Sequence, residues 1–580
     1  MYALQFEDVS ISYRTRDESG APTEFEAVKH VTLRLPRRGT LGIAGESGSG
    51  KSTLIMSALR LLPDNATVTG TVRLGEHDVN QLSWGQVRAV RWKEASIVFQ
   101  GAMHSLNPVQ RVGRQIAEAM QLHDPKGGRS GRNAYRKDVA GLLEQVDLPS
   151  HTIDAYPHEL SGGQKQRIMI AMALACDPEV IIADEPTTAL DVIVQERVLD
   201  LLTKLVQDRG LSLLMITHDL SVLAKTCDEI AVLYRGEIVE SGPSREILAN
   251  PQHPHTRALT DAVPVIGDQK SRLNPASRKQ SEPGQTTAVP VVTGGIGDEV
   301  LGADDLSVRF HTRIGEIRAV DGVDLSCREG EITVLVGQSG SGKTTLVRTV
   351  LGLQPPTGGA VTFRGRPLSH KQRELREYRG SVQFVLQDPM SALNPKHTVY
   401  EIIAEGIRVQ GLEGDERERV RQALLAAELT PPERFFTKLP QELSGGQRQR
   451  VVIAGALALE PEFLIADEPV ASLDASVRGE ILALLLRLKQ ERGLGCLVIT
   501  HDLGVAWNIG DRVLVMHRGK IVESGPAEEV LLDPQHDYTK RLLAAVPTMA
   551  ERGAAPDAAE RTDVAKGAAS DAELAEKGNE

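Results

Sequence analysis

Hydrophobic and polar residues alternate over residues 4–13, and this period of two predicts a strand. A second strand is predicted over residues 27–35, after a polar loop. Short, uninterrupted apolar runs then occur at residues 180–183 and 213–216. The first leads into Asp184-Glu185, and the second leads through Thr217 into His218. Such runs are typical of strands buried on both faces of a parallel sheet. Helical patterns lie between them, so the chain is predicted to have an α/β fold.

The pentapeptide LSGGQ occurs twice, at residues 160–164 and 443–447. In each copy 24 positions separate the serine from a glutamate (185 − 161 and 468 − 444). A further 33 positions separate that glutamate from a histidine (218 − 185 and 501 − 468). A period on the order of 280 residues is far longer than a solenoid repeat, so the sequence predicts a duplicated domain.

Each half carries a glycine-rich G-x-x-x-x-G-K-[ST] loop between a predicted strand and a predicted helix. The glycines let successive backbone N–H groups point at phosphate oxygens, and the helix N-terminus adds its dipole. Lys51 and Lys343 are expected to bridge the β- and γ-phosphates, with Ser52 and Thr344 as Mg²⁺ ligands. The predicted phosphate-binding residues are Gly45, Ser47, Gly48, Gly50, Lys51, Ser52 and Thr53, and in the second half Gly337, Ser339, Gly340, Gly342, Lys343, Thr344 and Thr345.

The LSGGQ segments each open a predicted amphipathic helix, with a Ser-Gly-Gly turn at its N-terminus. Such a terminus can bind an anion, although for this turn alone an ordinary capped helix is the simpler interpretation. The residues concerned are Ser161, Gly162, Gly163 and Gln164, and Ser444, Gly445, Gly446 and Gln447.

Two acids end one apolar run in each half, Asp184-Glu185 and Asp467-Glu468, and a histidine follows the next run. The carboxyl ends of parallel strands are where α/β sheets bind ligands. Solvated loop acids and a structural histidine are the alternatives, but the apolar runs and the equal spacing in both halves favour a site. His218 and His501 are the histidines.

The chain has 580 residues, 41% hydrophobic, 25% charged and 3% aromatic, which fits two soluble domains. A net charge of −12 argues against broad nucleic-acid binding, although a local basic stripe can hide within it. The four cysteines are scattered without CxxC spacing and predict neither a zinc site nor a disulfide framework. The sequence shows no signal peptide and no long apolar run, so we expect a cytoplasmic chain that reaches a membrane only through a partner.

The expected domains are residues 1–264 and 299–547. Residues 265–298 are rich in Pro, Gly, Ser and Thr and predict a flexible linker, and residues 548–580 predict a disordered, Ala-rich acidic tail. The two lysines are 292 apart (343 − 51), but the two signature serines are 283 apart (444 − 161). A polar, helical insertion, over residues 102–157 in the first half, is therefore nine residues longer there (292 − 283), a loop-scale difference.

The order of phosphate loop, Gln100 loop, LSGGQ, Asp-Glu strand, the Ala-Leu-Asp at 189–191 and His218 resembles an ABC-type ATPase domain, and it appears twice. The chain is similar more narrowly to the fused twin ATPase of bacterial peptide-type importers (oligopeptide, dipeptide, glutathione, nickel). The segments that carry this resemblance are QDPMSALNP at 387–395, its variant QGAMHSLNP at 100–108, and the closing elements PQHPHT at 251–256 and PQHDYT at 534–539.

The resemblance implies two P-loop ATPase domains, each with a RecA-like α/β core, an antiparallel β subdomain and an inserted helical lobe. It implies that they clamp head to tail around two ATP molecules, with each signature segment closing over the ATP of the other half. Both sites keep their motifs, so two hydrolytically competent sites are predicted. Several family members carry a cysteine cluster for an iron–sulfur centre, but the linker and tail here contain no Cys, so none is predicted.

The site roles follow from the same resemblance. Asp184 and Asp467 would hold Mg²⁺, and Gln100 and Gln387 would sense Mg²⁺ and the lytic water. Glu185 and Glu468 would polarise that water, and the histidines would contact the γ-phosphate. Tyr13 and Phe310 are the aromatic residues expected to stack on adenine.

The implied partners are two integral membrane permease subunits, contacted at the Gln100 and Gln387 loops, and indirectly an extracytoplasmic substrate-binding protein. This places the chain at the cytoplasmic face of the membrane, with no nucleic-acid partner. A twin-ATPase translation factor is the main alternative, but its usual long, charged helical linker and basic extensions are not seen here. A DNA-repair ATPase and an exporter are disfavoured, because a zinc-binding CxxC, a long coiled coil and fused membrane spans are not seen in the sequence. The solute is expected to be a peptide, with glutathione and nickel as alternatives.

Overall fold

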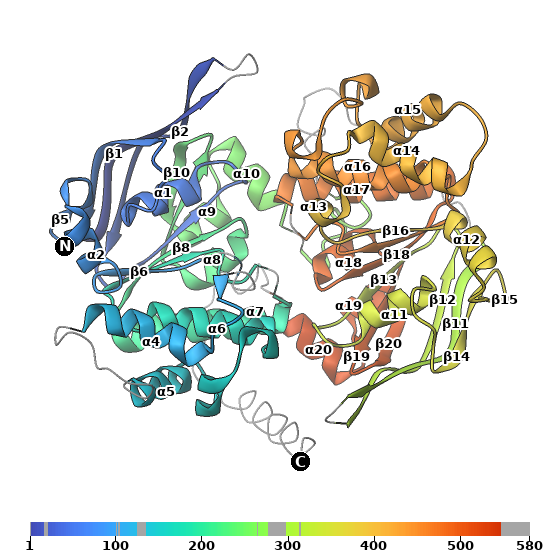
Figure 1. The fold of residues 1–580 in the computed structure, drawn as a ribbon, viewed down its shortest axis with the longest axis horizontal. Helices are drawn as coiled ribbons and strands as arrows, with labels where there is room; N and C mark the ends of the chain where they lie inside the picture. Colours follow the sequence, from blue (N-terminus) through green and yellow to red (C-terminus); the bar gives the residue numbers. More distant parts are fainter. Residues whose placement is uncertain are drawn as a thin grey trace.

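The computed structural model describes residues 2–16, 21–99, 101, 105–124, 135–188, 190–263, 265–275, 297–312, 315–471 and 473–546. It contains two α/β domains of the same architecture, side by side in Figure 1. Each has one antiparallel sheet and one larger, mostly parallel sheet, which confirms the predicted fold class. Within the described residues, no helix is long and apolar enough to cross a membrane.

The small antiparallel sheet of the first domain has the order β2-β1-β4-β5, and that of the second has the equivalent order β12-β11-β14-β15. In β1, a register shift lies between Phe6 and Val9, so that both side chains are buried although they are three positions apart. A bulge of this kind adds one residue and returns the next apolar side chain to the core face. The strands are β1 Tyr2–Arg16, β2 Pro22–Pro36, β4 Ala66–Leu74 and β5 His77–Asp78, and β11 Glu299–Thr312, β12 Gly315–Arg328, β14 Gly358–Phe363 and β15 Arg366–Pro367.

The large sheet has the order β10-β9-β3-β8-β7-β6 in the first domain. The second domain has the equivalent order, read from the opposite end of the sheet, β16-β17-β18-β13-β19-β20. All neighbours are parallel except the last hairpin, β9 with β10 and β19 with β20. The strands are β3 Thr40–Ala44, β6 Ala95–Val98, β7 Val180–Asp184, β8 Ser212–Thr217, β9 Glu229–Tyr234 and β10 Glu237–Pro243, and β13 Ile332–Val336, β16 Val382–Val385, β17 Phe463–Asp467, β18 Gly495–Thr500, β19 Arg512–His517 and β20 Lys520–Pro526. Because β3, β8 and β7 are neighbours, the phosphate loop, the histidine and the acids emerge at one edge of the sheet.

Helices cover both faces of each large sheet. The helices of the first domain are α1 Lys51–Ala58, α2 Trp84–Val90, α4 Val112–His123, α5 Arg136–Gln145, α6 Gly162–Ala173, α7 Val192–Arg209, α8 Leu220–Thr226, α9 Ser244–Ala249 and α10 Pro254–Asp261. Those of the second are α11 Lys343–Val350, α12 Gln372–Ser381, α13 Pro389–Ala392, α14 Val399–Gln410, α15 Glu416–Ala426, α16 Gly445–Leu457, α17 Ala475–Arg492, α18 Leu503–Ile509, α19 Ala527–Leu532 and α20 Asp537–Ala544.

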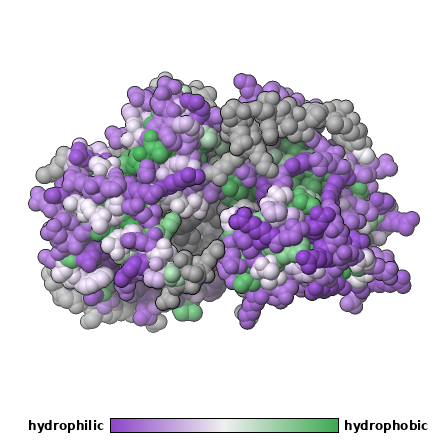
Figure 2. All heavy atoms as spheres, turned by 90° about the horizontal axis from the view of Figure 1, so that it is seen from above, coloured by the Kyte–Doolittle hydropathy of each residue, from purple (hydrophilic) through white to green (hydrophobic). Residues whose placement is uncertain are grey.

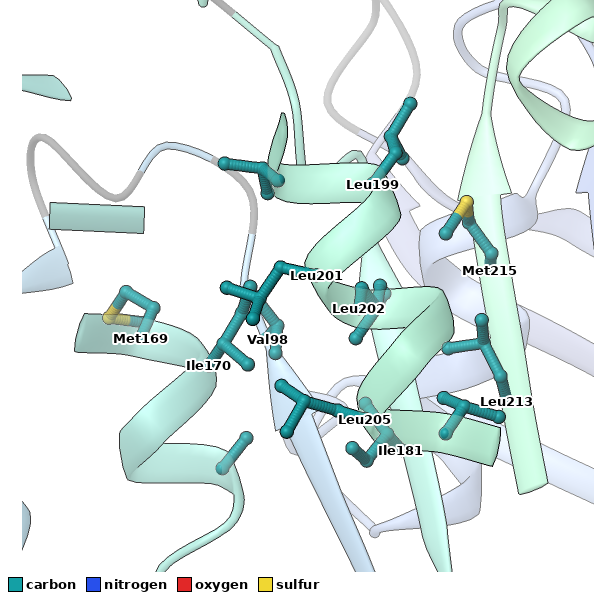
Figure 3. Packing of buried hydrophobic residues seen from close by; sticks show 14 of the residues in the cluster. Val98, Met169, Ile170, Ile181, Leu199, Leu201, Leu202, Leu205, Leu213 and Met215 are labelled. Carbon is teal, nitrogen blue, oxygen red and sulfur yellow. The ribbon is translucent and has the colours of Figure 1, made fainter. Parts of the chain in front are cut away.

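The α6 and α7 helices pack on one face of the first domain's sheet, and Figure 3 shows the side chains that meet there. Ile170 of α6 and Leu205 of α7 lie against Val98 and Ile181, which point from β6 and β7. The α1 helix belongs to the second core of this domain, between the large sheet and the small one. The two cores therefore fix the phosphate-loop helix and the signature helix on opposite faces of one sheet.

The predicted helical lobe is present in both domains, as α4 and α5 against α6 and as α13 to α15 against α16. In the second domain it has a core of its own, which includes Val399, Ile403 and Leu424. The signature segment at the start of α16 is therefore held between the lobe and the sheet.

Residues 265–275 of the predicted linker have defined contacts with the second domain, and residues 276–296 lie outside the described residues. Arg272 Nη1 donates to the Trp507 carbonyl oxygen at 2.9 Å, and Trp507 Nε1 donates to the Asp268 carbonyl oxygen at 3.1 Å. Ile266 and Leu273 pack on the apolar core around α18. Composition alone indicated flexibility here. The apolar side chains of Ile266 and Leu273 and the aromatic ring of Trp507 instead allow residues 265–275 to pack on the second domain. The predicted tail at 548–580 also lies outside the described residues, and the domain boundaries stay predictions.

Candidate functional site

Each phosphate loop curls tightly because a strand of the small sheet presses on one of its glycines. Gly50 has φ 105°, and a Cβ there would lie 2.4 Å from the Ala27 carbonyl oxygen. Gly342 has φ 110°, and its Cβ would lie 2.1 Å from the Ala319 carbonyl oxygen. Only glycine fits this conformation and this distance, so the motif's last glycine in each half is required by the fold.

The motif lysines lie on their own loops. Lys51 Nζ donates to the carbonyl oxygens of Gly45 and Glu46, both at 2.8 Å. Lys343 makes the corresponding two contacts at 2.5 and 2.9 Å. Burial lowers the pKa of both ammonium groups, and the charges of nearby carboxylates, that of Glu185 first for Lys51, oppose this. A buried cation on a tightly curled glycine-rich loop suits an anionic phosphate chain.

The first acid of each pair is positioned for a cation. Ser52 Oγ donates to Asp184 Oδ1 at 3.3 Å, and Asp184 is 3% exposed. Burial raises the pKa of Asp184. Burial, together with the charge of Glu468, raises the pKa of Asp467 to about 6. Buried oxygen donors whose negative charge is poorly stabilised fit the hard cation Mg²⁺.

The second acid of each pair is held by the predicted histidine. Glu185 Oε1 lies 3.2 Å from His218 Nδ1, and Glu468 Oε1 lies 2.8 Å from His501 Nδ1. Both glutamates have φ 45°, a left-handed conformation that is unusual outside glycine and clusters at functional sites. Burial disfavours their ionised form, but the hydrogen bond and charge of the histidine, the charge of the motif lysine and the hydrogen bond from Thr188 or Gln387 together outweigh it. The pKa of both carboxyl groups is therefore lowered.

The other oxygen of each glutamate also accepts a hydrogen bond. Thr188 Oγ1 donates to Glu185 Oε2 at 2.8 Å, and Gln387 Nε2 donates to Glu468 Oε2 at 2.8 Å. Gln100, predicted as the equivalent of Gln387, lies outside the described residues. Thr188 was missed by the sequence analysis, since Ala471 stands at its place in the second half and the repeat therefore gave no signal.

The signature segments are capped helix starts, as the simpler interpretation held. Ser161 Oγ accepts from the Gln164 N–H at 3.3 Å and its own N–H donates to Gln164 Oε1 at 2.9 Å, a capping box. Ser444 and Gln447 repeat it at 3.3 and 3.1 Å. The capping leaves the Ser-Gly-Gly turn at the positive end of a long helix, which is compatible with the predicted anion contact.

The second signature glycine is set by packing. A Cβ on Gly163 would lie 2.4 Å from Val194 Cγ1, and a Cβ on Gly446 would lie 2.4 Å from Val477 Cγ1. The signature helices therefore approach α7 and α17 too closely for any side chain at this position.

The two domains meet through reciprocal contacts that the sequence analysis did not identify. The Ser47 N–H donates to Asp474 Oδ1 at 2.6 Å, and the Ser339 N–H donates to Asp191 Oδ2 at 3.2 Å. Each aspartate stands six positions after the second acid (191 − 185 and 474 − 468). This repeated Leu-Asp was a usable signal, but only the tertiary structure shows that each aspartate points to the phosphate loop of the other half.

The predicted adenine-stacking aromatics lie on equivalent strands of the small sheets. Tyr13 on β1 donates its hydroxyl to Thr53 Oγ1 of the phosphate-loop helix at 3.3 Å. Phe310 on β11 is 39% exposed. Both are exposed enough to face a ligand, and their role stays a prediction.

Comparison with known proteins gives two family matches in each half. The ABC transporter family matches residues 28–188 and 320–471, and the oligopeptide/dipeptide transporter C-terminal region matches residues 239–289 and 522–569. The glutathione import ATP-binding protein GsiA of Escherichia coli O157:H7 is 41% identical over 542 residues, covering 90% of this chain and 86% of that protein. GsiA of Shigella dysenteriae is 42% identical with the same coverage. A solved structure of cbiO1 from Clostridium perfringens, part of the ABC transporter complex cbiONQ, matches 41% of this chain and 92% of its own with 31% identity and a TM-score of 0.37.

Both halves thus match the ABC transporter family, and both contain a match to the oligopeptide/dipeptide transporter C-terminal region. The chain belongs to the ABC transporter family as a fused double ATPase of the oligopeptide/dipeptide type, and it hydrolyses ATP for peptide-type import.

Proposed function

We propose that the chain binds two ATP molecules with Mg²⁺ at two composite sites between its halves, and that it drives a separate pair of membrane permease subunits. One site consists of the phosphate loop around Lys51 and the signature segment at Ser444. The other consists of the loop around Lys343 and the signature segment at Ser161. The imported solute is a small peptide, and glutathione is the first candidate.

The reciprocal aspartate contacts carry this proposal. Asp474 of the second half binds the first phosphate loop, and Asp191 of the first half binds the second. Only a head-to-tail arrangement gives both contacts at once, since each loop then faces the segment between the Asp-Glu strand and the following helix of the other half. In that arrangement, ATP adds contacts across the interface until hydrolysis removes them, which converts bond cleavage into domain opening.

The residues of each site divide the chemistry. Backbone N–H groups of the loop and the lysine hold the phosphates, and the helix N-terminus at the opposite signature serine adds positive potential at the γ-phosphate. Glu185 and Glu468, with lowered pKa, are ionised at neutral pH and can accept a hydrogen bond from the attacking water. His218 and His501 fix the glutamates and lie near the same phosphate.

Mg²⁺ fits the oxygen donors present, namely Ser52 and Asp184 in one site and Thr344 and Asp467 in the other. When bound, the cation would neutralise charge that develops on the β- and γ-phosphate oxygens. Gln100 and Gln387 are proposed as further ligands through their amide oxygens. Tyr13 and Phe310 would stack on adenine, so base discrimination should be modest.

The Gln387 loop supports docking of a membrane partner. Leu386 is 43% exposed and Met390 is 51% exposed, on either side of Gln387. Exposed apolar side chains next to a catalytic loop suit a short helix of a permease subunit. Figure 2 shows one face of the molecule, which is mostly hydrophilic, with hydrophobic residues in scattered groups. The chain would thereby be held at the cytoplasmic face of the membrane.

The test is purification of the tagged chain from gently solubilised membranes of its host. Two polytopic membrane proteins should co-purify, and reconstituted with them the chain should import glutathione or a dipeptide only with hydrolysable ATP and Mg²⁺. Recovery with ribosomal proteins and absence from membranes would contradict the transport role. The closing-region family match in both halves makes the first outcome the expected one.

A further inference from the structure

The closing element of the second domain reaches the phosphate loop of that domain. Its loop is held on β20, since Glu523 Oε1 accepts from the Gln535 N–H at 2.7 Å and Glu523 Oε2 accepts from the His536 N–H at 3.2 Å. The α20 helix follows and carries Tyr538, which is 2% exposed. An anchored helix start with a buried aromatic therefore lies next to the nucleotide site.

Tyr538 contacts the loop through its hydroxyl. The Gln338 N–H donates to Tyr538 Oη at 3.0 Å, and the phenol ring stacks on His517 of β19 with ring centroids 3.9 Å apart. The carbonyl oxygen of Gln338 accepts from Lys343 Nζ at 2.9 Å and from the Ser341 N–H at 3.2 Å. The residue that Tyr538 holds thus also anchors the phosphate-binding lysine.

The same loop is held from the other half one residue later, where the Ser339 N–H donates to Asp191. Burial raises the pKa of Tyr538, and the charge of Asp191 adds to this, whereas the Gln338 bond and Arg541 act against it. The phenol is therefore protonated at neutral pH, and its oxygen can still accept a hydrogen bond from the Gln338 N–H.

The first domain has different chemistry at these positions. His255 stands where Tyr538 stands in the second, and it stacks on Tyr234 of β9 with ring centroids 4.0 Å apart. The tyrosine and histidine of the stacked pair have exchanged places, so the first domain has an imidazole at this sequence position and not a phenol. Glu46 stands where Gln338 stands.

We propose that Tyr538 is a positioning residue for the ATP site built on Lys343: its hydroxyl fixes Gln338, and through it the lysine and the loop, in the shape that binds phosphate. The domain that carries Lys51 has His255 at this position, so the two ATP sites differ in the residue type that stands there. This inference rests on the proposed two-site function. It gives the closing element of peptide-type ATPases a part in nucleotide binding.

The test measures binding of a fluorescent ATP analogue with Mg²⁺ to the full chain, with one site disabled at a time. Lys51→Ala leaves the Lys343 site, and Lys343→Ala leaves the Lys51 site. Adding Tyr538→Phe removes one hydroxyl and keeps the ring. Loss of a hydrogen bond to a part-buried N–H predicts about threefold to tenfold weaker binding in the Lys51→Ala background. No change beyond about twofold is expected in the Lys343→Ala background.

Tyr378→Phe is the matched control. Tyr378 is also buried, 3% exposed, and its hydroxyl donates to the Val350 carbonyl oxygen at 2.8 Å in the same domain, at the far end of α11. It should leave the analogue's Kd unchanged in both backgrounds. A loss of affinity equal to that of Tyr538→Phe would assign the effect to general destabilisation and overturn the inference.

The outcomes separate the inference from the proposed function. The number of bound nucleotides is measured first. We expect two in the wild type and one in each lysine variant, and any other result overturns both the proposed function and the role of Tyr538. If that stoichiometry holds, an unchanged Kd for Tyr538→Phe in the Lys51→Ala background, or an equal loss in both backgrounds, overturns the role of Tyr538 alone.

Discussion

The Ser47 N–H donates to Asp474 Oδ1 at 2.6 Å, although the two residues are 427 positions apart. Together with the equivalent contact of Ser339 with Asp191, it connects the phosphate loop of each half to the other half. Each phosphate loop is therefore in direct contact with the other half.

Asp474→Ala should weaken this connection at the Lys51 loop. The Ser47 N–H loses a charged acceptor, and a hydrogen bond to a charged group contributes about 1.5–3 kcal/mol. We expect ATPase activity to fall about tenfold or more. The free energy of unfolding should fall by less than this range of about 1.5–3 kcal/mol. Steady-state hydrolysis and thermal denaturation measure the two. Asp208→Ala, at an exposed position of α7, should change neither, and equal losses from both variants would contradict the role of Asp474.

Glu185→Gln combined with Glu468→Gln should trap ATP and abolish turnover. The amide keeps the shape of the carboxylate but cannot accept the water's hydrogen bond with a full negative charge. Activity should fall at least about a hundredfold, the lower range of general-base effects, with ATP binding retained. Phosphate release and retention of radiolabelled ATP are the measurements. Glu144→Gln, exposed on α5, is the control. Unchanged ATPase activity in the double variant would contradict the role of Glu185 and Glu468.

Asp467→Asn should make the nucleotide-free protein more stable at neutral pH. The pKa of Asp467 is about 6 in the fold against a usual 3.8, so the folded state binds the proton more tightly than the unfolded state. Stability of the wild type then falls as pH rises from about 4 to about 6, because the half-buried carboxyl group must ionise. The gain of the variant should be full above about pH 6 and vanish below about pH 4.

Thermal denaturation from pH 4 to pH 8 checks this, with Asp533→Asn at an exposed position as control. Mg²⁺ with ATP should stabilise the wild type and not the variant, because the cation compensates the buried charge. A variant that is less stable than the wild type at pH 7.5 without nucleotide would contradict the prediction.

Gly446→Ala should displace the second signature helix, since its Cβ would lie 2.4 Å from Val477 Cγ1. Overpacking of this kind costs about 1–3 kcal/mol of unfolding free energy. Adding Val477→Ala should restore part of the stability and part of the ATPase activity. A double-mutant cycle by denaturant unfolding measures the change in stability, and steady-state hydrolysis measures the activity.

Gly455→Ala is the control on the same helix, α16, because no atom lies within 4 Å of its Cβ position. It should be neutral or stabilise by about 0.5–1 kcal/mol through helix propensity. Equal destabilisation by Gly446→Ala and Gly455→Ala would show that the helix tolerates no alanine, and that Val477 is not the cause.

The sequence by itself determined the duplication, the fold class and the motif residues, because these depend on local patterns. A glycine-rich loop between strand and helix, an apolar run ending in Asp184-Glu185, and a histidine 33 positions later can be found along the chain without knowing what packs on them. Their meeting at one sheet edge follows from the rule that parallel strands end together.

Only the tertiary structure decided the contacts between distant segments. It paired Asp474 with Ser47, Tyr538 with Gln338, and residues 265–275 with the second domain around Trp507. It also showed that Glu185 accepts from Thr188 and that Glu468 accepts from Gln387. The physical reason is that such contacts depend on which surfaces come within hydrogen-bonding distance after folding, and neither periodicity nor spacing along the chain encodes that distance.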